Sequence, residues 1–248
     1  MRTLTAWLSA AIVGVVCAGA GAHAATGGAP SPGRAPASAR GPAVADLPLI
    51  VVPAAPGKRS PWFAVFLSGD GGWAMIDRRI AAALAAQGLP VVGWNSLRYF
   101  WRPRTPEEAS RDLDRLVRHY SREFGKSRVL LIGFSQGADT LPFMVNRLPP
   151  ATRALVGLTA LLGLSDSADF AIHVSNWLGK PPAGLPTAPE LARWRGSSVL
   201  CIYGATDRDA ACTRAPGPQG TTIEMPGGHH FDGRYAAIAD RILAHLPR

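Results

Sequence analysis

Short apolar runs, often β-branched, alternate along this chain with longer segments whose apolar residues recur at helical spacing. The short runs predict strands, because most are apolar at nearly every position, as in a parallel sheet covered on both faces. They are residues 47–52, 62–68, 89–93, 128–133, 154–158, 198–203 and 221–225.

The segments between these runs predict helices at 74–87, 106–124, 137–148 and 234–246. The second has a charged face and an opposite apolar face, which carries Leu113, Leu116, Val117 and Tyr120. Gly88 and Gly125 lie where helix C-terminal glycines belong, and Pro142 is expected to kink or loosen the third helix. The alternation predicts an α/β domain with a mostly parallel sheet and helices on both faces.

The first 24 residues have the pattern of an export signal. Arg2 precedes an apolar run at 6–16 that is too short to span a bilayer, and Ala22-His23-Ala24 has the small residues that signal peptidase reads. We expect cleavage after Ala24 and a periplasmic product, with an uncleaved anchor as the alternative. Residues 25–45 are rich in Ala, Gly, Pro and Ser and predict a flexible linker, which leaves 46–248 as one domain.

The formal net charge is +9, and loss of Arg2 with the signal would lower it by one to +8. The basic residues are scattered and no basic stripe alternates with aromatic residues, so we expect no nucleic-acid partner. Attraction to an anionic membrane surface fits this charge better. A coding bias toward Arg and Ala is the alternative explanation.

Gly133-Phe134-Ser135-Gln136-Gly137 follows a predicted strand and precedes a predicted helix. In that context a G-x-S-x-G pattern is typical of the nucleophile turn of an α/β-hydrolase, because small neighbours let the backbone bend and expose the hydroxyl. The helix N-terminus also favours developing negative charge. Ser135 is therefore the predicted nucleophile, and an incidental serine in a glycine-rich connection is the alternative.

A serine hydroxyl needs a base to take its proton. The best candidate lies in Gly227-Gly228-His229-His230, directly after the last predicted strand. Gly-Gly-His is the usual setting of the catalytic residue in such folds and favours His229. His230 remains the competing candidate.

The acid that orients the histidine should follow a strand end. Asp207 comes three residues after Gly204, which ends the predicted strand 198–203, and Asp209 is the competing candidate. A salt bridge with a nearby arginine is the non-catalytic explanation for either. The order Ser135, Asp207, His229 matches the serine–acid–histidine order of α/β-hydrolases.

Acyl transfer also requires donors for the oxyanion. The backbone N–H of Gln136, just after the nucleophile, is one candidate. The second should come from Ser68-Gly69-Asp70-Gly71-Gly72-Trp73, with the N–H of Asp70 preferred over that of Gly71. No Lys-Ser/Thr follows these glycines, so a phosphate-binding loop is disfavoured. No metal-ligand spacing is present, and we expect no cofactor.

Two cysteines remain after Cys17 leaves with the signal. Cys201 and Cys212 predict a disulfide in an oxidising compartment, with two free thiols as the alternative. Such a bridge would contribute roughly 2–3 kcal/mol in the chain-entropy model. It would also enclose the loop that carries Asp207.

Residues 164–196 do not follow the strand–helix alternation and lie between two predicted strands, where hydrolases of this type often insert a lid. The stretch includes Phe170, His173, Trp177 and a turn-like Gly179-Lys180-Pro181-Pro182. Its aromatic residues favour partial burial or contact with substrate. A poorly packed surface excursion is the alternative.

Several uncommon strings extend the similarity beyond a general hydrolase, from about residue 47 to the C-terminus. They resemble the VirJ/AcvB family of exported, virulence-associated bacterial proteins in its short, single-domain form. The strings are Phe66-Leu67-Ser68-Gly69-Asp70-Gly71-Gly72-Trp73, Ser96-Leu97-Arg98-Tyr99-Phe100-Trp101, Arg104-Thr105-Pro106-Glu107, Gly137-Ala138-Asp139, Leu141-Pro142-Phe143, Asn146-Arg147-Leu148-Pro149 and Gly227-Gly228-His229-His230-Phe231-Asp232-Gly233.

This resemblance implies a periplasmic serine hydrolase that releases the amino acid from aminoacyl-phosphatidylglycerol, typically the lysyl form, at the membrane surface. In some members it also implies type IV secretion components as partners. A cationic aminoacyl group would need a nearby carboxylate, for which Asp139 and Asp70 are candidates; a structural hydrogen bond is the alternative for Asp139. A non-catalytic secretion chaperone or adaptor and a broad carboxylesterase or thioesterase are the rival functions.

Overall fold

The computed structural model describes residues 43–172, 184–195, 198–213 and 220–247. Among these residues, seven strands form one sheet in the order β1-β3-β2-β4-β5-β8-β9. Only the pairing of β1 with β3 is antiparallel within it. The strands are β1 (Leu49–Val52), β2 (Trp62–Leu67), β3 (Val91–Trp94), β4 (Arg128–Phe134), β5 (Val156–Leu162), β8 (Ser198–Gly204) and β9 (Gly220–Met225).

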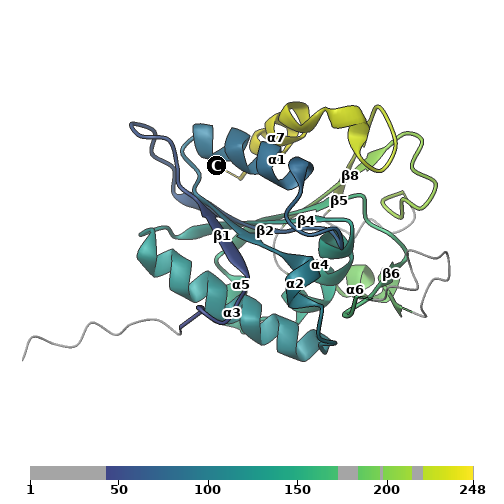
Figure 1. The fold of residues 1–248 in the computed structure, drawn as a ribbon, viewed down its shortest axis with the longest axis horizontal. Coiled ribbons are helices and arrows are strands. Elements are labelled where there is room, and N and C mark those ends of the chain that lie inside the picture. Colours follow the sequence, from purple (N-terminus) through teal and green to yellow (C-terminus); the bar gives the residue numbers. More distant parts are fainter. Residues whose placement is uncertain (1–42, 173–183, 196–197, 214–219, 248) are drawn as a thin grey trace, which may run out of the picture. The chain divides into compact units, whose positions relative to one another are not determined.

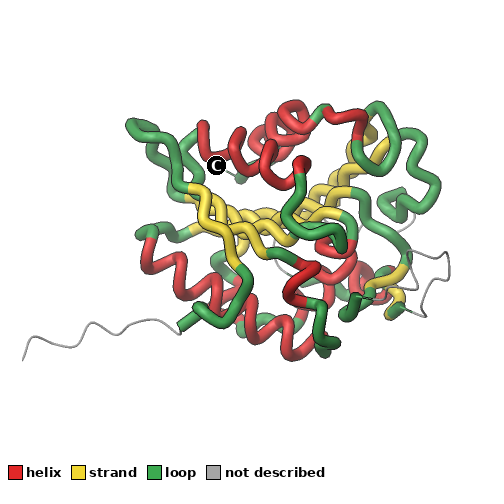
Figure 2. The backbone as a smooth tube through the Cα atoms, viewed as in Figure 1, coloured by secondary structure: helices red, strands yellow, loops and turns green. Residues whose placement is uncertain are grey.

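Helices cover both faces of this sheet (Figures 1 and 2). α1 (Met75–Ala86) and α7 (Tyr235–Ala244) lie on one face, and α3 (Pro106–Glu123) and α4 (Gln136–Asn146) lie on the other. Each face has its own apolar core, to which the alternate side chains of the central strands contribute. The predicted fold class, a mostly parallel sheet between two helix layers, is confirmed.

Both ends of α3 have capping features, of which the C-terminal glycine was predicted. Thr105 Oγ1 accepts from the N–H of Glu108 at 3.1 Å, and Glu108 Oε2 accepts from the N–H of Thr105 at 2.8 Å. This reciprocal cap satisfies donors that would otherwise lack partners at the helix start. Past the other end, Gly125 has a φ of +61°. The predicted apolar face of the helix is buried.

Several short elements were not predicted, and two predicted features differ in detail. β5 runs to Leu162, past the expected end at 158, and α4 continues through Pro142. The unpredicted elements are the helices α2 (Ser96–Tyr99), α5 (Pro150–Arg153) and α6 (Ala188–Ala192), the pair β6 (Ser167–Ala168) and β7 (Leu185–Pro186), and a 3-10 turn at Phe231–Gly233. Each spans a single turn or a few residues, which is too short for a periodic pattern.

The N-terminal predictions fall largely outside the described residues, which exclude 1–24 and the linker up to residue 42. The last part of the expected linker belongs to the folded domain, because Val44 is buried in the core and the carbonyl of Ala43 accepts from Arg115 Nη2 at 2.6 Å. Within the described part of the chain, no helix is both long and apolar enough to cross a membrane.

The strand order indicates which edge of the sheet is suited to bind a ligand. β2 has β3 on one side and β4 on the other, so the chain reverses its direction across the sheet between β2 and β4. In open α/β sheets, ligands bind at the carboxyl ends of the strands near such a reversal. The segments after β2, β4, β5, β8 and β9 all leave the sheet at this edge.

Candidate active site

Ser135 occupies the turn between β4 and α4 and has a φ of +53° and a ψ of −123°. A residue with a side chain rarely adopts this conformation, which costs on the order of 1–3 kcal/mol. Its N–H donates to the carbonyl of Leu162 on β5 at 2.9 Å, and its side chain is partly exposed. A strained serine at a strand-to-helix turn is the geometry expected of a nucleophile elbow.

The two glycines of the pentapeptide allow the backbones to approach closely around this turn. A β-carbon on Gly137 would lie 2.4 Å from the carbonyl oxygen of Leu67 on β2. A β-carbon on Gly133 would lie 2.4 Å from the carbonyl carbon of Gly137. Larger residues at either position would therefore push α4 away from the sheet and displace Ser135.

His229 and Asp207 are in direct contact at the same edge. His229 Nδ1 lies 2.8 Å from Asp207 Oδ2, and the Asp207 side chain is only 6 % exposed. Asp209 is exposed and instead donates its backbone N–H to Asp207 Oδ1 at 3.3 Å. His230 is also exposed, and its ring lies against Phe134. The structure thus joins the side chains of the two preferred candidates, Asp207 and His229.

Three features hold the loops that carry Asp207 and His229. Ala205 donates its N–H to the carbonyl of Met225 at 2.8 Å, and Thr206 donates to the carbonyl of Gly227 at 3.0 Å. The aromatic ring of Phe231 is fully buried beneath the histidine loop. The predicted disulfide between Cys201 and Cys212 is confirmed, and it ties the far end of the Asp207 loop to β8.

Two contacts bring the histidine to the nucleophile turn. The ring of Phe134, the residue before Ser135, has its centroid 5.3 Å from that of His229. Gly163, just after β5, has a φ of +64°, and a β-carbon there would lie 2.8 Å from Cε1 of His229. This glycine was not among the predicted site residues; its position just after an apolar run was the available signal.

The expected oxyanion loop also borders Ser135. A β-carbon on Gly69 would lie 3.3 Å from Cβ of Ser135. The turn closes through a hydrogen bond from the N–H of Gly72 to the carbonyl of Gly69, and it leaves Asp70 and Gly71 exposed. Gln136 opens α4, where backbone N–H groups have no acceptor within the helix.

The side chain of Gln136 fastens the expected insertion to this turn. Its Nε2 donates to the carbonyls of Asp169 and Ala171 at 3.1 and 3.2 Å. Of the predicted insertion 164–196, residues 164–172 and 184–195 are described, and Phe170 is buried. His173, Trp177 and the turn Gly179-Lys180-Pro181-Pro182 lie outside the described residues. The start of the insertion therefore packs beside the turn that carries Ser135.

Asp139, one turn into α4, is buried beneath the site. Its two carboxylate oxygens accept from the backbone N–H and the hydroxyl of Ser165, each at 2.8 Å. Burial raises the pKa of Asp139 to about 7, although the hydrogen bonds from Ser165 act to lower it. The charges of Asp70 and Asp166 add to the rise. Ser165 lies 26 positions further along the chain, and no sequence signal linked the two residues.

The disulfide yields a prediction about stability. We expect the Cys201→Ala/Cys212→Ala variant to lose roughly 2–3 kcal/mol of unfolding free energy, because its unfolded chain is no longer constrained. Urea unfolding measures the loss, and hydrogen exchange across 205–211 should become faster. Reductant should reproduce the loss in the wild type and leave the variant unaffected. Equal stability of variant and wild type would contradict this role.

Asp139 yields a prediction about pH. Its pKa is about 7 in the folded protein and about 4 in an unfolded chain, so the unfolded state loses this proton first as the pH rises. The associated stability is complete below about pH 4 and is lost by about pH 7, a change on the order of a few kcal/mol. Asp139→Asn keeps the neutral shape and should lack this loss. Urea unfolding from pH 4.5 to 8 tests it, and parallel curves for the two proteins would refute it.

Comparison with solved structures places this architecture among α/β-hydrolases. MenH from S. aureus aligns with a TM-score of 0.58 and 12% identity over 79% of this chain and 97% of that chain. A lipase-esterase related protein from Clostridium acetobutylicum aligns with a TM-score of 0.56 and 12% identity over 80% and 99%. Est1E from Butyrivibrio proteoclasticus, solved with ferulic acid, gives 0.55 and 12% over 79% and 92%. At these identities the likeness shows the fold alone.

A search of curated protein sequences found no match. The sequence model of one family, described as "Bacterial virulence protein (VirJ)", matches residues 61–248. This range includes the nucleophile turn, the Asp207 loop and the histidine loop. The chain belongs to the VirJ family and has the α/β-hydrolase fold.

Proposed function

We propose that this protein is an exported serine hydrolase that cleaves the aminoacyl ester of aminoacyl-phosphatidylglycerol through an acyl-enzyme. The lysyl form is the expected substrate. The observation that carries the catalytic part is the 2.8 Å contact of His229 with Asp207 at the sheet edge where Ser135 is held in its strained turn. The choice of lipid rests on family membership and on the charges around the site.

The proposed reaction begins when Ser135 Oγ attacks the ester carbonyl and His229 takes the serine proton. Asp207 accepts a hydrogen bond from the Nδ1–H of His229, which fixes the tautomer and leaves Nε2 to act as the base. The tetrahedral oxyanion would accept from the N–H groups of Gln136 and Asp70, and one such donor contributes about 3–4 kcal/mol. His229 then protonates the departing lipid alcohol. Water, deprotonated by His229, then attacks the acyl-enzyme, and His229 returns this proton to Ser135 Oγ as the amino acid leaves.

Carboxylates near the nucleophile support a cationic acyl group. Asp70 is exposed at the oxyanion turn, and its charge and that of Asp166 both act on Asp139. Ser165 already occupies both oxygens of Asp139, so Asp70 is better placed to meet an ammonium group directly. Asp139, buried one turn into α4, would add to the negative electrostatic potential at this position. An ammonium group at this position would also favour the charged form of Asp139.

The disulfide supports an exported location, because such bonds persist in oxidising compartments such as the periplasm. The positive net charge supports approach to an anionic membrane. Contact with type IV secretion components is the remaining part of the proposal and rests on family membership alone. The rival functions, a non-catalytic secretion adaptor and a broad carboxylesterase or thioesterase, differ in their need for Ser135.

Ser135→Ala tests catalysis directly. We expect release of lysine from lysyl-phosphatidylglycerol vesicles to fall by at least about a thousandfold, because no other group forms the acyl-enzyme. Mass spectrometry of the released amino acid measures the rate, and thermal unfolding verifies that the variant folds. Wild-type protein that cleaves simple esters and leaves the lipid intact would indicate the broad esterase. Full biological activity of Ser135→Ala would indicate the adaptor.

Asp70→Asn tests recognition of the cationic group, because it removes the carboxylate and keeps the backbone N–H. We expect kcat/KM to fall about tenfold for the lysyl lipid. The fall should be several-fold smaller for a lipid carrying N-acetylated alanine, which has no ammonium. Asp240→Asn on α7 removes an equally exposed charge away from this edge and serves as the matched control. Equal losses on both lipids would refute a role for Asp70 in charge recognition.

A further inference from the structure

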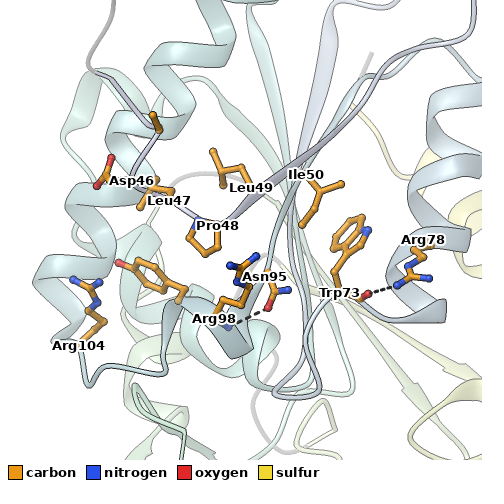
Figure 3. A pocket seen from close by; sticks show the side chains of 12 residues that line it. Asp46, Leu47, Pro48, Leu49, Ile50, Trp73, Arg78, Asn95, Arg98 and Arg104 are labelled. Carbon is orange, nitrogen blue, oxygen red and sulfur yellow. Dashed lines mark hydrogen bonds between the residues drawn. The ribbon is translucent and has the colours of Figure 1, made fainter.

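A basic pocket of about 650 Å³ lies at the same sheet edge, on the side of β1 and β3 (Figure 3). Three arginines from separate segments line it: Arg78 on α1, Arg98 on α2, and Arg104 before α3. In Figure 3, Arg98 lies between Arg104 and Arg78. None of the residues assigned to the reaction lines this pocket.

The charge in this pocket is largely uncompensated. Among the described residues that line it, Asp46 is the one carboxylate, and both its oxygens accept from Arg115 at 2.6 and 3.1 Å. Arg115 does not line the pocket. The three lining arginines therefore leave an excess of positive charge, which an anion would neutralise.

The guanidinium of Arg104 has an unused donor. It lies over the ring of Tyr99, 4.9 Å from the ring centroid. Its Nε is buried and has no hydrogen-bond partner among the described residues. This donor is enclosed by the protein, so the charge of Arg104, held over the Tyr99 ring in the pocket wall, is what would attract an anion. At the other end, Arg78 Nη2 donates to the carbonyl of Trp73 at 3.1 Å, which fixes that side chain.

The oxyanion turn separates this pocket from the nucleophile. A β-carbon on Gly72 would lie 3.1 Å from Oδ1 of Asn95, a pocket residue, whereas one on Gly69 would lie 3.3 Å from Cβ of Ser135. A hydrogen bond joins Gly72 to Gly69 across the turn. One ligand of modest length could therefore reach both Ser135 and the pocket over this turn.

Exposed apolar side chains flank the pocket in sequence. Met75 follows Trp73 and precedes Arg78, and Trp101 lies between Arg98 and Arg104. They are 64 % and 63 % exposed. Exposed tryptophan beside arginine is typical of surfaces that meet lipid headgroups, where an amphipathic ring and a cation are both well solvated.

We propose that this pocket binds the phosphate of a phosphodiester lipid headgroup while the ester of that lipid lies at Ser135. The assignment rests on the proposed function and extends it. Guanidinium groups form paired, charge-assisted hydrogen bonds with phosphate oxygens. In an aminoacyl-phosphatidylglycerol, the ammonium and the phosphate lie on opposite sides of the ester. With the ester at Ser135, the arginine pocket would bind the phosphate on the far side of the oxyanion turn.

The test compares two double variants of equal charge. Arg78→Gln/Arg98→Gln alters the pocket, and Arg79→Gln/Arg102→Gln removes two exposed neighbours that do not line it. The readout is kcat/KM for lysyl-phosphatidylglycerol vesicles divided by kcat/KM for lysine p-nitrophenyl ester, which has no phosphate. We expect this ratio to fall at least about tenfold in the pocket variant and to stay within about twofold in the control.

Equal falls in both variants would show that general surface charge acts and would overturn the pocket assignment. Inorganic phosphate provides the second arm. If millimolar phosphate protects wild type against thermal unfolding, and the pocket variant binds phosphatidylglycerol vesicles as well as wild type does, the site takes free phosphate and the lipid assignment fails.

Failure of the proposed function is distinguishable from failure of this assignment. If wild type does not cleave the lysyl lipid, cosedimentation with phosphatidylglycerol vesicles against phosphatidylcholine vesicles tests the pocket alone. Weaker binding of the pocket variant than of the control would then support the headgroup site, and equal binding would overturn it.

Discussion

The close packing of α4 against the sheet is the constraint on which the site depends. Gly137 brings the helix backbone against the carbonyl of Leu67, at a distance that leaves no room for a β-carbon. β4 must therefore turn sharply into α4, and Ser135 takes up that turn with a positive φ. The strain, on the order of 1–3 kcal/mol, persists because β4 and the first turns of α4 are buried on all sides.

The other half of the site follows from strand register. β8 and β9 are adjacent and parallel, and Gly204 pairs with Met225, so both loops leave the sheet at the same level. Backbone hydrogen bonds from Ala205 and Thr206 then join the loops before either side chain is considered. The contact between Asp207 and His229 is thus a consequence of register, and the disulfide restricts the acid loop on its free side.

The sequence was most informative where one segment contains its own signal. The apolar runs predicted all seven strands of the sheet, and the pattern of α3 predicted its buried face, because both depend on local periodicity. Ser135, Asp207 and His229 could be proposed from their places after strands. The hydrogen bonds of Asp139 to Ser165 and the contact of Gly163 with His229 could not, because each joins segments that only the folded sheet brings together. The arginine pocket also could not be predicted from one segment. Arg98 and Arg104 lie in strings that carry the family resemblance, whereas Arg78 reaches the pocket only through the packing of α1.

The charges of the molecule act over two distances, one through the net charge and one through the groups close to the site. The net charge of +9 would attract an anionic surface from a distance, yet carboxylates gather near Ser135. The net positive charge and the local carboxylates do not conflict, because salt screens exposed charges beyond about 8–10 Å. A ligand in the site therefore interacts mainly with the charges next to it. Around Ser135 the charged neighbours Asp70 and Asp139 are acidic, and beyond the oxyanion turn they are basic. A ligand that carries an ammonium at one end and a phosphate at the other would match both regions in one orientation only, with its ammonium near Ser135 and its phosphate in the arginine pocket. The division of charge therefore favours one binding mode of such a ligand.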